Sequence, residues 1–196
     1  MNATGQNHTN SNSNPIQGGL LQPQAGETTY HAQPYNLDAR GFYFTSMEDY
    51  TAKAEANTDR WGAPVEEYEL QFIDGTDAEA ELFAALGINQ ANLEAWFDDV
   101  VDLDEREQAA LSYIVGDLGY SLADALDKID DVNLYTGSLV EAATELFDEL
   151  YLHDIPQAVR YYVDYEAFAR DQRLAGAMTE TEFAGTTYTV TNADAL

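Results

Sequence analysis

A very large excess of negative charge constrains this chain more than any other sequence feature. Among its 196 residues, 36 Asp and Glu face only 8 Lys and Arg, which gives a formal net charge of −28. A small domain needs a net charge of only about 2–8 for solubility, and further like charge destabilises the compact state through self-repulsion. The excess therefore indicates a function that requires it.

The charge also excludes classes of partner. Nucleic-acid phosphates are bound by Lys and Arg side chains, which are scarce here. Anionic membrane surfaces attract clusters of the same basic residues. We therefore expect neither bare nucleic acid nor a membrane as a partner.

The rest of the composition is typical of a folded chain. Apolar residues make up 45% and aromatic residues 12% of the sequence, enough to build a core. The absence of cysteine excludes disulfides, thiolate metal sites and cysteine nucleophiles. No apolar run reaches the ~20 residues of a membrane span, and the N-terminus lacks the basic start and apolar core of a signal peptide. We expect a soluble, cytoplasmic protein.

The N-terminal part divides into a tail and a small domain. Residues 1–37 are rich in Asn, Gln and Gly, with Glu27 as the only charge, which predicts a flexible, disordered tail. Residues 38–75 are predicted to form an N-terminal α+β domain. The pattern predicts, in order, a strand over 41–46, a helix over 47–57 with Ser46 as its N-cap, and a half-buried strand over 67–73.

Residues 76–131 change to a helical period. Apolar residues between Leu93 and Val101 recur at i, i+3, i+4, i+7 and i+8, which is the stripe of a core-facing helix. Gly87 and Gly119 are placed to end helices. The segment is predicted to be an acidic bundle of short helices.

Residues 132–196 mix both periods and are predicted to form a C-terminal α+β domain. The pattern predicts, in order, a strand over 132–135, a helix over 139–151 capped by Ser138, a helix over 160–173 and a strand over 183–190. The predicted fold class of the whole chain is therefore α+β, built from a small α+β unit, a short-helix bundle and a second α+β unit.

Acidic residues concentrate between residues 74 and 154, where 21 carboxylates meet only Arg106 and Lys128, a net charge of −19. Duplex DNA carries one charge per ~1.7 Å, so this charge matches about 32 Å of duplex, close to one helical turn. The density favours a surrogate for DNA phosphates over an ordinary solvated face. The candidate partner-binding residues are Asp98, Asp99, Asp102, Asp104, Glu105, Asp117, Asp124, Asp127, Asp130, Asp131, Glu141, Glu145, Asp148 and Glu149.

Motifs for catalysis or metal binding are not found in the sequence. Adjacent carboxylates such as Asp98 and Asp99 are expected by chance among 36 acidic residues. The sequence has no Ca²⁺-binding loop, no Gly-rich phosphate loop and no nucleophile elbow. His153 is the only histidine outside the predicted tail. We therefore expect no catalytic residue, no metal and no cofactor.

Two other functions also account for the acidity. The chain could be an acidic adaptor or chaperone for a basic DNA-binding protein, which needs charge but no DNA-like geometry. Alternatively, the acidity could reflect a high-salt host and serve solubility alone. A metal-dependent enzyme is the weakest alternative, because no spacing supports it.

Several segments resemble one known family. The stretch from Asp154 to Gly176, above all Tyr162-Val-Asp-Tyr-Glu-Ala-Phe-Ala-Arg-Asp171, resembles the hallmark segment of ArdA-type antirestriction proteins. Supporting matches are Phe42-Tyr-Phe-Thr-Ser-Met-Glu-Asp-Tyr50, the span from Glu66 to Gly75, and Glu141-Ala-Ala-Thr-Glu-Leu-Phe147. The resemblance covers roughly residues 41 to 191, in the family's order. The turn Asp59-Arg-Trp-Gly-Ala-Pro64 is shorter than the corresponding family segment.

The resemblance implies both a fold and a function. It implies an elongated three-part α+β chain that forms homodimers and mimics bent B-form DNA. Such proteins inhibit type I restriction-modification enzymes by occupying their DNA-binding groove. The family's antirestriction motif and dimer contact lie in the last domain, which here points to the helix over 139–151 and its surroundings. The density of aromatic residues in that domain points to Tyr161, Tyr162, Tyr165 and Phe168 as the dimer contact.

Overall fold

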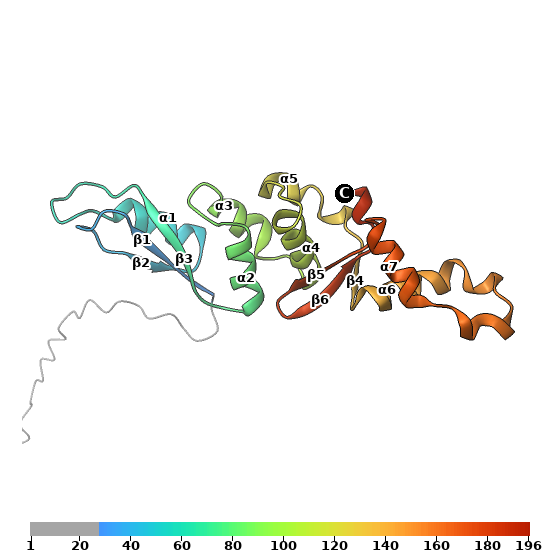
Figure 1. Ribbon diagram of the computed structural model, residues 1–196. Coiled ribbons are helices and arrows are strands. Elements are labelled where there is room, and N and C mark those ends of the chain that lie inside the picture. Colours follow the sequence, from blue (N-terminus) through green and yellow to red (C-terminus); the bar gives the residue numbers. More distant parts are fainter. Residues whose placement is uncertain (1–27) are drawn as a thin grey trace, which may run out of the picture.

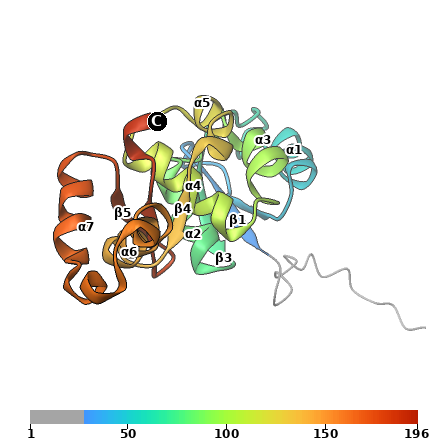
Figure 2. The ribbon, with the colours of Figure 1, turned by 90° about the vertical axis from the view of Figure 1, so that its right-hand side faces the viewer.

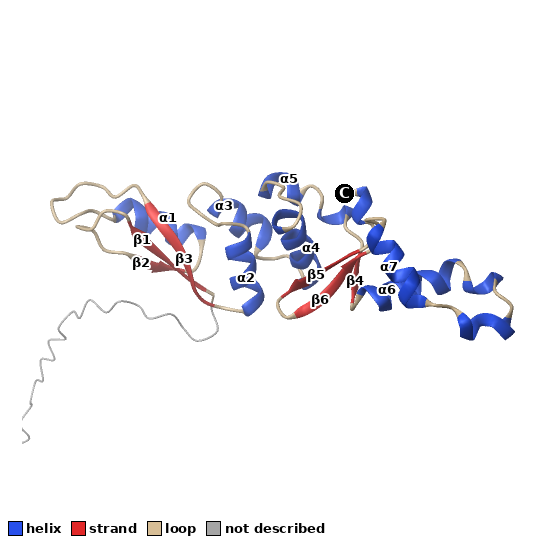
Figure 3. Cartoon of the chain, in the orientation of Figure 1, coloured by secondary structure: helices blue, strands red, loops and turns tan. Residues whose placement is uncertain are grey.

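The computed structural model describes residues 28–196 as an elongated body with two small antiparallel sheets (Figures 1 and 3). The first sheet lies at the N-terminal end, short helices follow it, and the second sheet and a helical arm form the other end. The chain is therefore a mixed α+β protein, as its sequence predicts. Within the described residues, no helix combines the length and the hydropathy that a membrane span needs.

The first sheet has the strand order β2-β1-β3. Its strands are β1 (Thr29–Pro34), β2 (Phe42–Phe44) and β3 (Tyr68–Asp74). Helix α1 (Met47–Ala56) follows β2, and the Ser46 hydroxyl oxygen accepts a hydrogen bond from the Asp49 amide at 3.2 Å. This bond satisfies one of the free amides at the start of the helix. The predicted Ser46 cap and the helix that follows it are confirmed. The predicted strands before and after this helix are confirmed as β2 and β3.

Strand β1 corrects the predicted tail. The tail was expected to extend to residue 37, but residues 29–34 form the central strand of the first sheet. Tyr30 and Ala32 face the core, while His31 and Gln33 alternate with them. The alternation is short and lies in a polar segment, so periodicity alone gave no signal. Residues 1–27 of the predicted tail lie outside the described part of the chain.

Tyr30 is the centre of an aromatic cluster that joins the first sheet to the helices. Its side chain is 1% exposed, and its ring centroid lies 5.3 Å from that of Phe44 and 5.5 Å from that of Phe83. The Trp96 indole Nε1 donates a hydrogen bond to the Tyr30 hydroxyl oxygen at 2.9 Å. Burial raises the pKa of Tyr30 to about 12. A residue expected in a tail therefore anchors the core.

Short helices form the middle of the molecule. In order they are α2 (Asp77–Ala85), α3 (Leu93–Ala95), the π-helical turn η1 (Trp96–Val100), α4 (Glu105–Gly116), α5 (Leu122–Leu126) and the 3₁₀ turn η2 (Ile129–Asp131). The predicted apolar stripe is confirmed, because Leu93, Trp96 and Val100 are each at most 1% exposed. The same turns leave Asp98 and Asp99 exposed.

The second sheet has the strand order β4-β6-β5. Its strands are β4 (Leu134–Thr136), β5 (Thr179–Phe183) and β6 (Thr186–Val190). One strand was predicted over 183–190. The segment instead contains the last residue of β5, a two-residue turn and β6, which belong to one antiparallel hairpin. Ala184 and Gly185 have φ values of 49° and 74°, the left-handed conformation that two-residue hairpin turns require. The alanine concealed the turn, because that conformation favours glycine.

The remaining helices form the end opposite the first sheet. They are α6 (Leu139–Leu150), the 3₁₀ turns η3 (Leu152–Asp154) and η4 (Gln157–Tyr162), α7 (Tyr165–Leu174) and the terminal turn η5 (Ala193–Ala195). Figure 2 shows α6 and α7 side by side. The helix predicted over 160–173 is instead broken between Tyr162 and Tyr165, where the Asp164 side chain caps α7. Residues 151–164, which we call the distal arm, extend beyond the two helices in Figure 1.

The buried side chains form a nearly continuous core. One cluster extends from Tyr30 in the first sheet, through Trp96 and Leu111 in the helices, to Val190 in the second sheet. A separate small cluster, centred on Ala143 and Met178, lies under α6 and α7. The division into three domains stays a prediction, but the first sheet, the helices and the second sheet share one packed interior.

Candidate functional site

The candidate carboxylates lie on the helices from η1 to α6 and on the turns beside them. Asp98 and Asp99 are in η1, Asp102 and Asp104 in the turn after it, Glu105 and Asp117 at the two ends of α4, Asp124 and Asp127 in and after α5, Asp130 and Asp131 in η2, and Glu141, Glu145, Asp148 and Glu149 in α6. All are exposed except Asp148, which is half-buried. The helices therefore present this charge to solvent from the middle of the molecule to the end that carries α6 (Figure 1).

These carboxylates are not neutralised by cations of the described chain. In residues 28–196 the ion pairs involve Asp38, Asp49, Asp154 and Asp171, none of which belongs to the candidate set. The two basic residues nearest in sequence have other partners. The Arg106 guanidinium donates to the Leu134 carbonyl oxygen, and the Lys128 ammonium lies 5.3 Å from the centre of the Tyr120 ring. The negative charge of this surface is therefore uncompensated.

Some candidate carboxylates also stabilise helix ends, which the sequence analysis did not recognise. The Asp104 carboxylate accepts hydrogen bonds from the amides of Arg106 and Glu107, both at 2.9 Å, at the start of α4. The Glu141 carboxylate accepts from the Ser138 hydroxyl at 2.7 Å and from its amide at 2.9 Å. These bonds hold the pKa of Glu141 below its usual value. Such residues have a structural role whether or not they bind a partner.

Other candidates are held by side chains from distant elements. The Tyr188 hydroxyl donates to Glu105 at 3.3 Å, and the Thr181 hydroxyl donates to Asp117 at 3.3 Å. Both donors come from the second sheet, so these bonds fix carboxylates of α4 against it. A set of residues that looked uniform in the sequence therefore separates into tethered and unattached members.

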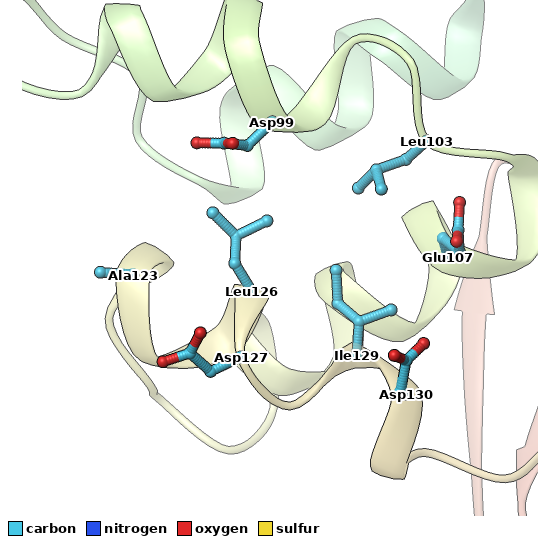
Figure 4. A pocket seen from close by; sticks show the side chains of 8 residues that line it. All are labelled: Asp99, Leu103, Glu107, Ala123, Leu126, Asp127, Ile129 and Asp130. Atoms are coloured by element: carbon cyan, nitrogen blue, oxygen red, sulfur yellow. The ribbon is translucent and has the colours of Figure 1, made fainter.

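A cleft opens beside three of the unattached carboxylates, those of Asp99, Asp127 and Asp130. It has a volume of about 580 Å³ and lies between η1, the start of α4, α5 and η2. Its lining residues are Asp99, Leu103, Glu107, Ala123, Leu126, Asp127, Ile129 and Asp130. Figure 4 shows Leu103, Leu126 and Ile129 directed into the space, with the carboxylates placed around them. We call it the Leu126 cleft.

A second, smaller groove of about 410 Å³ lies between α1 and the segment from α3 to η1. Its acidic lining residues are Glu48, Glu55, Glu94 and Asp98. Only Asp98 was among the candidates, and Glu107 of the Leu126 cleft was also missed. These glutamates come from three helices, α1, α3 and α4, so only the packing of the helices against one another could identify them.

No described group of three or more His, Asp or Glu side chains is arranged to hold a metal ion. The candidate carboxylates are spread over several helices and the turns between them. The arrangement can attract cationic groups over a long surface.

The four predicted dimer residues divide into two pairs. Tyr161 and Tyr162, in the distal arm, are 94% and 84% exposed. Tyr165 and Phe168, in α7, pack on their own chain. The Tyr165 hydroxyl donates to Asp148 at 2.5 Å, and the Phe168 ring centroid lies 5.1 Å from that of Phe147.

Comparison with known proteins finds a matching family but no matching individual protein. A family model described as antirestriction protein (ArdA) matches residues 38–185, well over half of the chain. The matched span includes every candidate carboxylate and all four aromatic residues of the predicted dimer contact. No curated protein and no solved structure matches the chain.

Proposed function

The chain belongs to the ArdA family of antirestriction proteins, and from this premise we propose that it is a DNA mimic that occupies the DNA-binding groove of a type I restriction-modification enzyme. Membership of the family implies antirestriction, an interaction with restriction enzymes and no catalysis. The mechanism and the type of target enzyme are the proposed part.

The uncompensated acidic surface is the observation that carries this proposal. Thirteen of the fourteen candidate carboxylates are exposed, and none pairs with a cation in the described chain. A DNA-binding groove is lined by Lys and Arg that neutralise phosphates and release counterions. An elongated protein with carboxylates along its length can satisfy the same cations. Such an inhibitor competes with DNA without contacting it.

We also propose that the protein forms a homodimer through the distal arm. Tyr161 and Tyr162 are almost fully exposed, and Val159 is 47% exposed in the same turn. Large aromatic side chains at such a tip are typical anchors of protein interfaces. Tyr165 and Phe168 support the arm from within the chain.

Sedimentation should give a dimer at micromolar concentration, and a joint Tyr161→Ala and Tyr162→Ala variant should be monomeric. A monomeric parent protein would contradict the proposal.

Competition for DNA tests the function. A labelled duplex bound to a purified type I methyltransferase core should be displaced as this protein is added, and displacement should weaken with rising salt. Failure to displace the duplex from several such enzymes would contradict the proposal. A histone-like basic protein is the control, since equal displacement from it would favour an acidic adaptor or chaperone instead.

A further inference from the structure

We propose that the Leu126 cleft receives one lysine or arginine side chain from the DNA-binding groove of the target enzyme. The inference rests on the proposed function and adds a specific anchoring contact to it. DNA phosphates offer charge without an apolar floor, whereas this cleft offers both.

The floor of the cleft is apolar and formed by residues distant in sequence. Leu103 follows η1, Leu126 ends α5, and Ile129 begins η2. Leu103 and Leu126 are half-buried and Ile129 is 9% exposed, so their inner sides belong to the core and their remaining surface faces the cleft. Figure 4 shows the three side chains directed toward one another from different segments. Covering this exposed apolar surface with another aliphatic group is favourable, because it removes the surface from water.

The rim of the cleft is acidic and lacks cationic partners. The carboxylate groups of Asp99, Asp127 and Asp130 make no hydrogen bond or ion pair with residues 28–196. Glu107 has one oxygen engaged, which accepts a hydrogen bond from the Asp104 amide at 2.8 Å. The rim therefore presents free carboxylate oxygens above an aliphatic surface.

The two basic residues nearest in sequence, Arg106 and Lys128, do not line the cleft. Lys128 lies in sequence between Asp127 and Ile129, which both line the cleft, but its ammonium lies over the Tyr120 ring. Arg106 lines an adjoining smaller cavity with Glu107 and Asp130, and donates to the Leu134 carbonyl oxygen. The cleft is thus open to a cation from another molecule.

Charge and shape select the occupant. Lysine and arginine have an aliphatic stem of three or four carbons and a charged end, so they can cover apolar surface while the charge remains with carboxylates. A volume of about 580 Å³ accommodates one such side chain. An acidic or purely apolar partner would leave the rim carboxylates desolvated and unpaired, which costs free energy. The partner group is therefore a long cationic side chain.

Filling the cleft tests the floor without changing charge. Leu126→Phe places a larger ring in the space, and Leu118→Phe is the matched control, since Leu118 is 37% exposed and lies outside the cleft. We expect Leu126→Phe to weaken binding to the methyltransferase core at least tenfold with an unchanged salt dependence. The control should stay within twofold. Thermal unfolding of both variants establishes that they are folded, and equal affinities for the two would overturn the proposal.

Neutralising three rim carboxylates, and comparing the loss of affinity with that caused by three neutralised carboxylates outside the cleft, tests the role of the rim charge. Asp99→Asn, Asp127→Asn and Asp130→Asn together remove as much charge as Asp102→Asn, Asp131→Asn and Glu145→Gln. The rim variant should lose at least tenfold more affinity than the control variant. Equal losses would mean that only total charge matters, which would overturn the cleft while leaving the mimicry intact.

A titration without any enzyme separates the cleft from the proposed function. N-acetylarginine amide and N-acetyllysine amide should shift the methyl NMR signals of Leu126 and Ile129 at lower concentrations than guanidinium or ammonium chloride, which lack the aliphatic stem. In Leu126→Phe, the Ile129 methyl signals should no longer show this difference. If the compounds that have the aliphatic stem and the salts that lack it gave identical titrations, the proposal would be overturned, even if the protein inhibits a restriction enzyme.

Discussion

The region around the first sheet and the central helices use their charges in opposite ways. Near the first sheet, Lys53 pairs with Asp49 at 2.7 Å and Arg60 pairs with Asp38 at 3.0 Å. In the central helices, the basic residues bind a carbonyl oxygen and an aromatic ring while many carboxylates stay exposed. The same chain therefore forms ion pairs in one region and leaves them unmade in another. The difference indicates that the central charge is available for a partner.

The two regions are nevertheless joined by one core. Tyr30 of β1 contacts Phe83 of α2 and accepts a hydrogen bond from Trp96 of η1. A binding surface that repels itself needs such support, because like charges destabilise the compact state. The first sheet thus contributes to the acidic surface by stabilising the helices that carry it.

The largest expected effect comes from breaking this shared core. Tyr30→Ala should lower the free energy of unfolding by about 3–5 kcal/mol, the usual cost of removing a large buried aromatic side chain. The first sheet and the central helices should lose stability in one transition, measured by denaturant titration with both far-UV and tryptophan signals. Tyr35→Ala is the control, since Tyr35 is 65% exposed in the following loop. Separate transitions would mean that the two regions are energetically independent.

A charge change in each region tests where the partner binds. Asp98→Asn, Asp102→Asn and Asp131→Asn together should weaken binding to a methyltransferase core by about 0.6–3 kcal/mol, because each exposed pair contributes about 0.2–1 kcal/mol. The salt dependence should also become shallower. The same number of changes near the first sheet, Glu66→Gln, Glu67→Gln and Glu69→Gln, should have a smaller effect. The reverse order would place the interface on the first sheet.

A smaller effect is expected where a candidate carboxylate caps a helix. Ser138→Ala removes the hydroxyl that lowers the pKa of Glu141, and it should destabilise the start of α6 by about 0.5–2 kcal/mol. The pKa of Glu141 should rise toward its ordinary value, measured by NMR titration. Because the folded pKa is depressed, the contribution of Glu141 is present above its unfolded pKa and is lost as pH falls through the folded value. An unchanged Glu141 titration in the variant would show that the Ser138 hydroxyl is not the cause, because the Ser138 amide bond to Glu141 remains.

The smallest effect concerns the ion pairs near the first sheet. Arg60→Gln breaks the pair with Asp38, and the free energy of unfolding should fall by less than about 1 kcal/mol because both side chains reach solvent. Inhibition should be unchanged, in contrast to the central charge variants. A tenfold loss of inhibition would assign Arg60 to the interface and remove the contrast between the two regions.

Local sequence patterns determined much of the fold. The caps at Ser46 and Ser138 were predicted and are confirmed, because in each the hydroxyl oxygen accepts a hydrogen bond from the amide three residues later. The stripe from Leu93 to Val101 was predicted for a similar reason, since helical period is a local property. The exposure of the acidic residues also follows from sequence, because unpaired carboxylates are costly to bury.

Tertiary structure alone decided the features that join distant segments. Strand β1 exists because Tyr30 pairs with Phe44 and Phe72 across the sheet, and no pattern within six polar-rich residues could specify those partners. The Leu126 cleft arises only where Leu103, Leu126 and Ile129 meet, and in the sequence each of them is an ordinary apolar residue. Sequence therefore determined which residues are charged, capped and periodic, since these depend on neighbours within about four positions. Packing between segments tens of residues apart determined which carboxylates surround an apolar floor, because such contacts leave no local period.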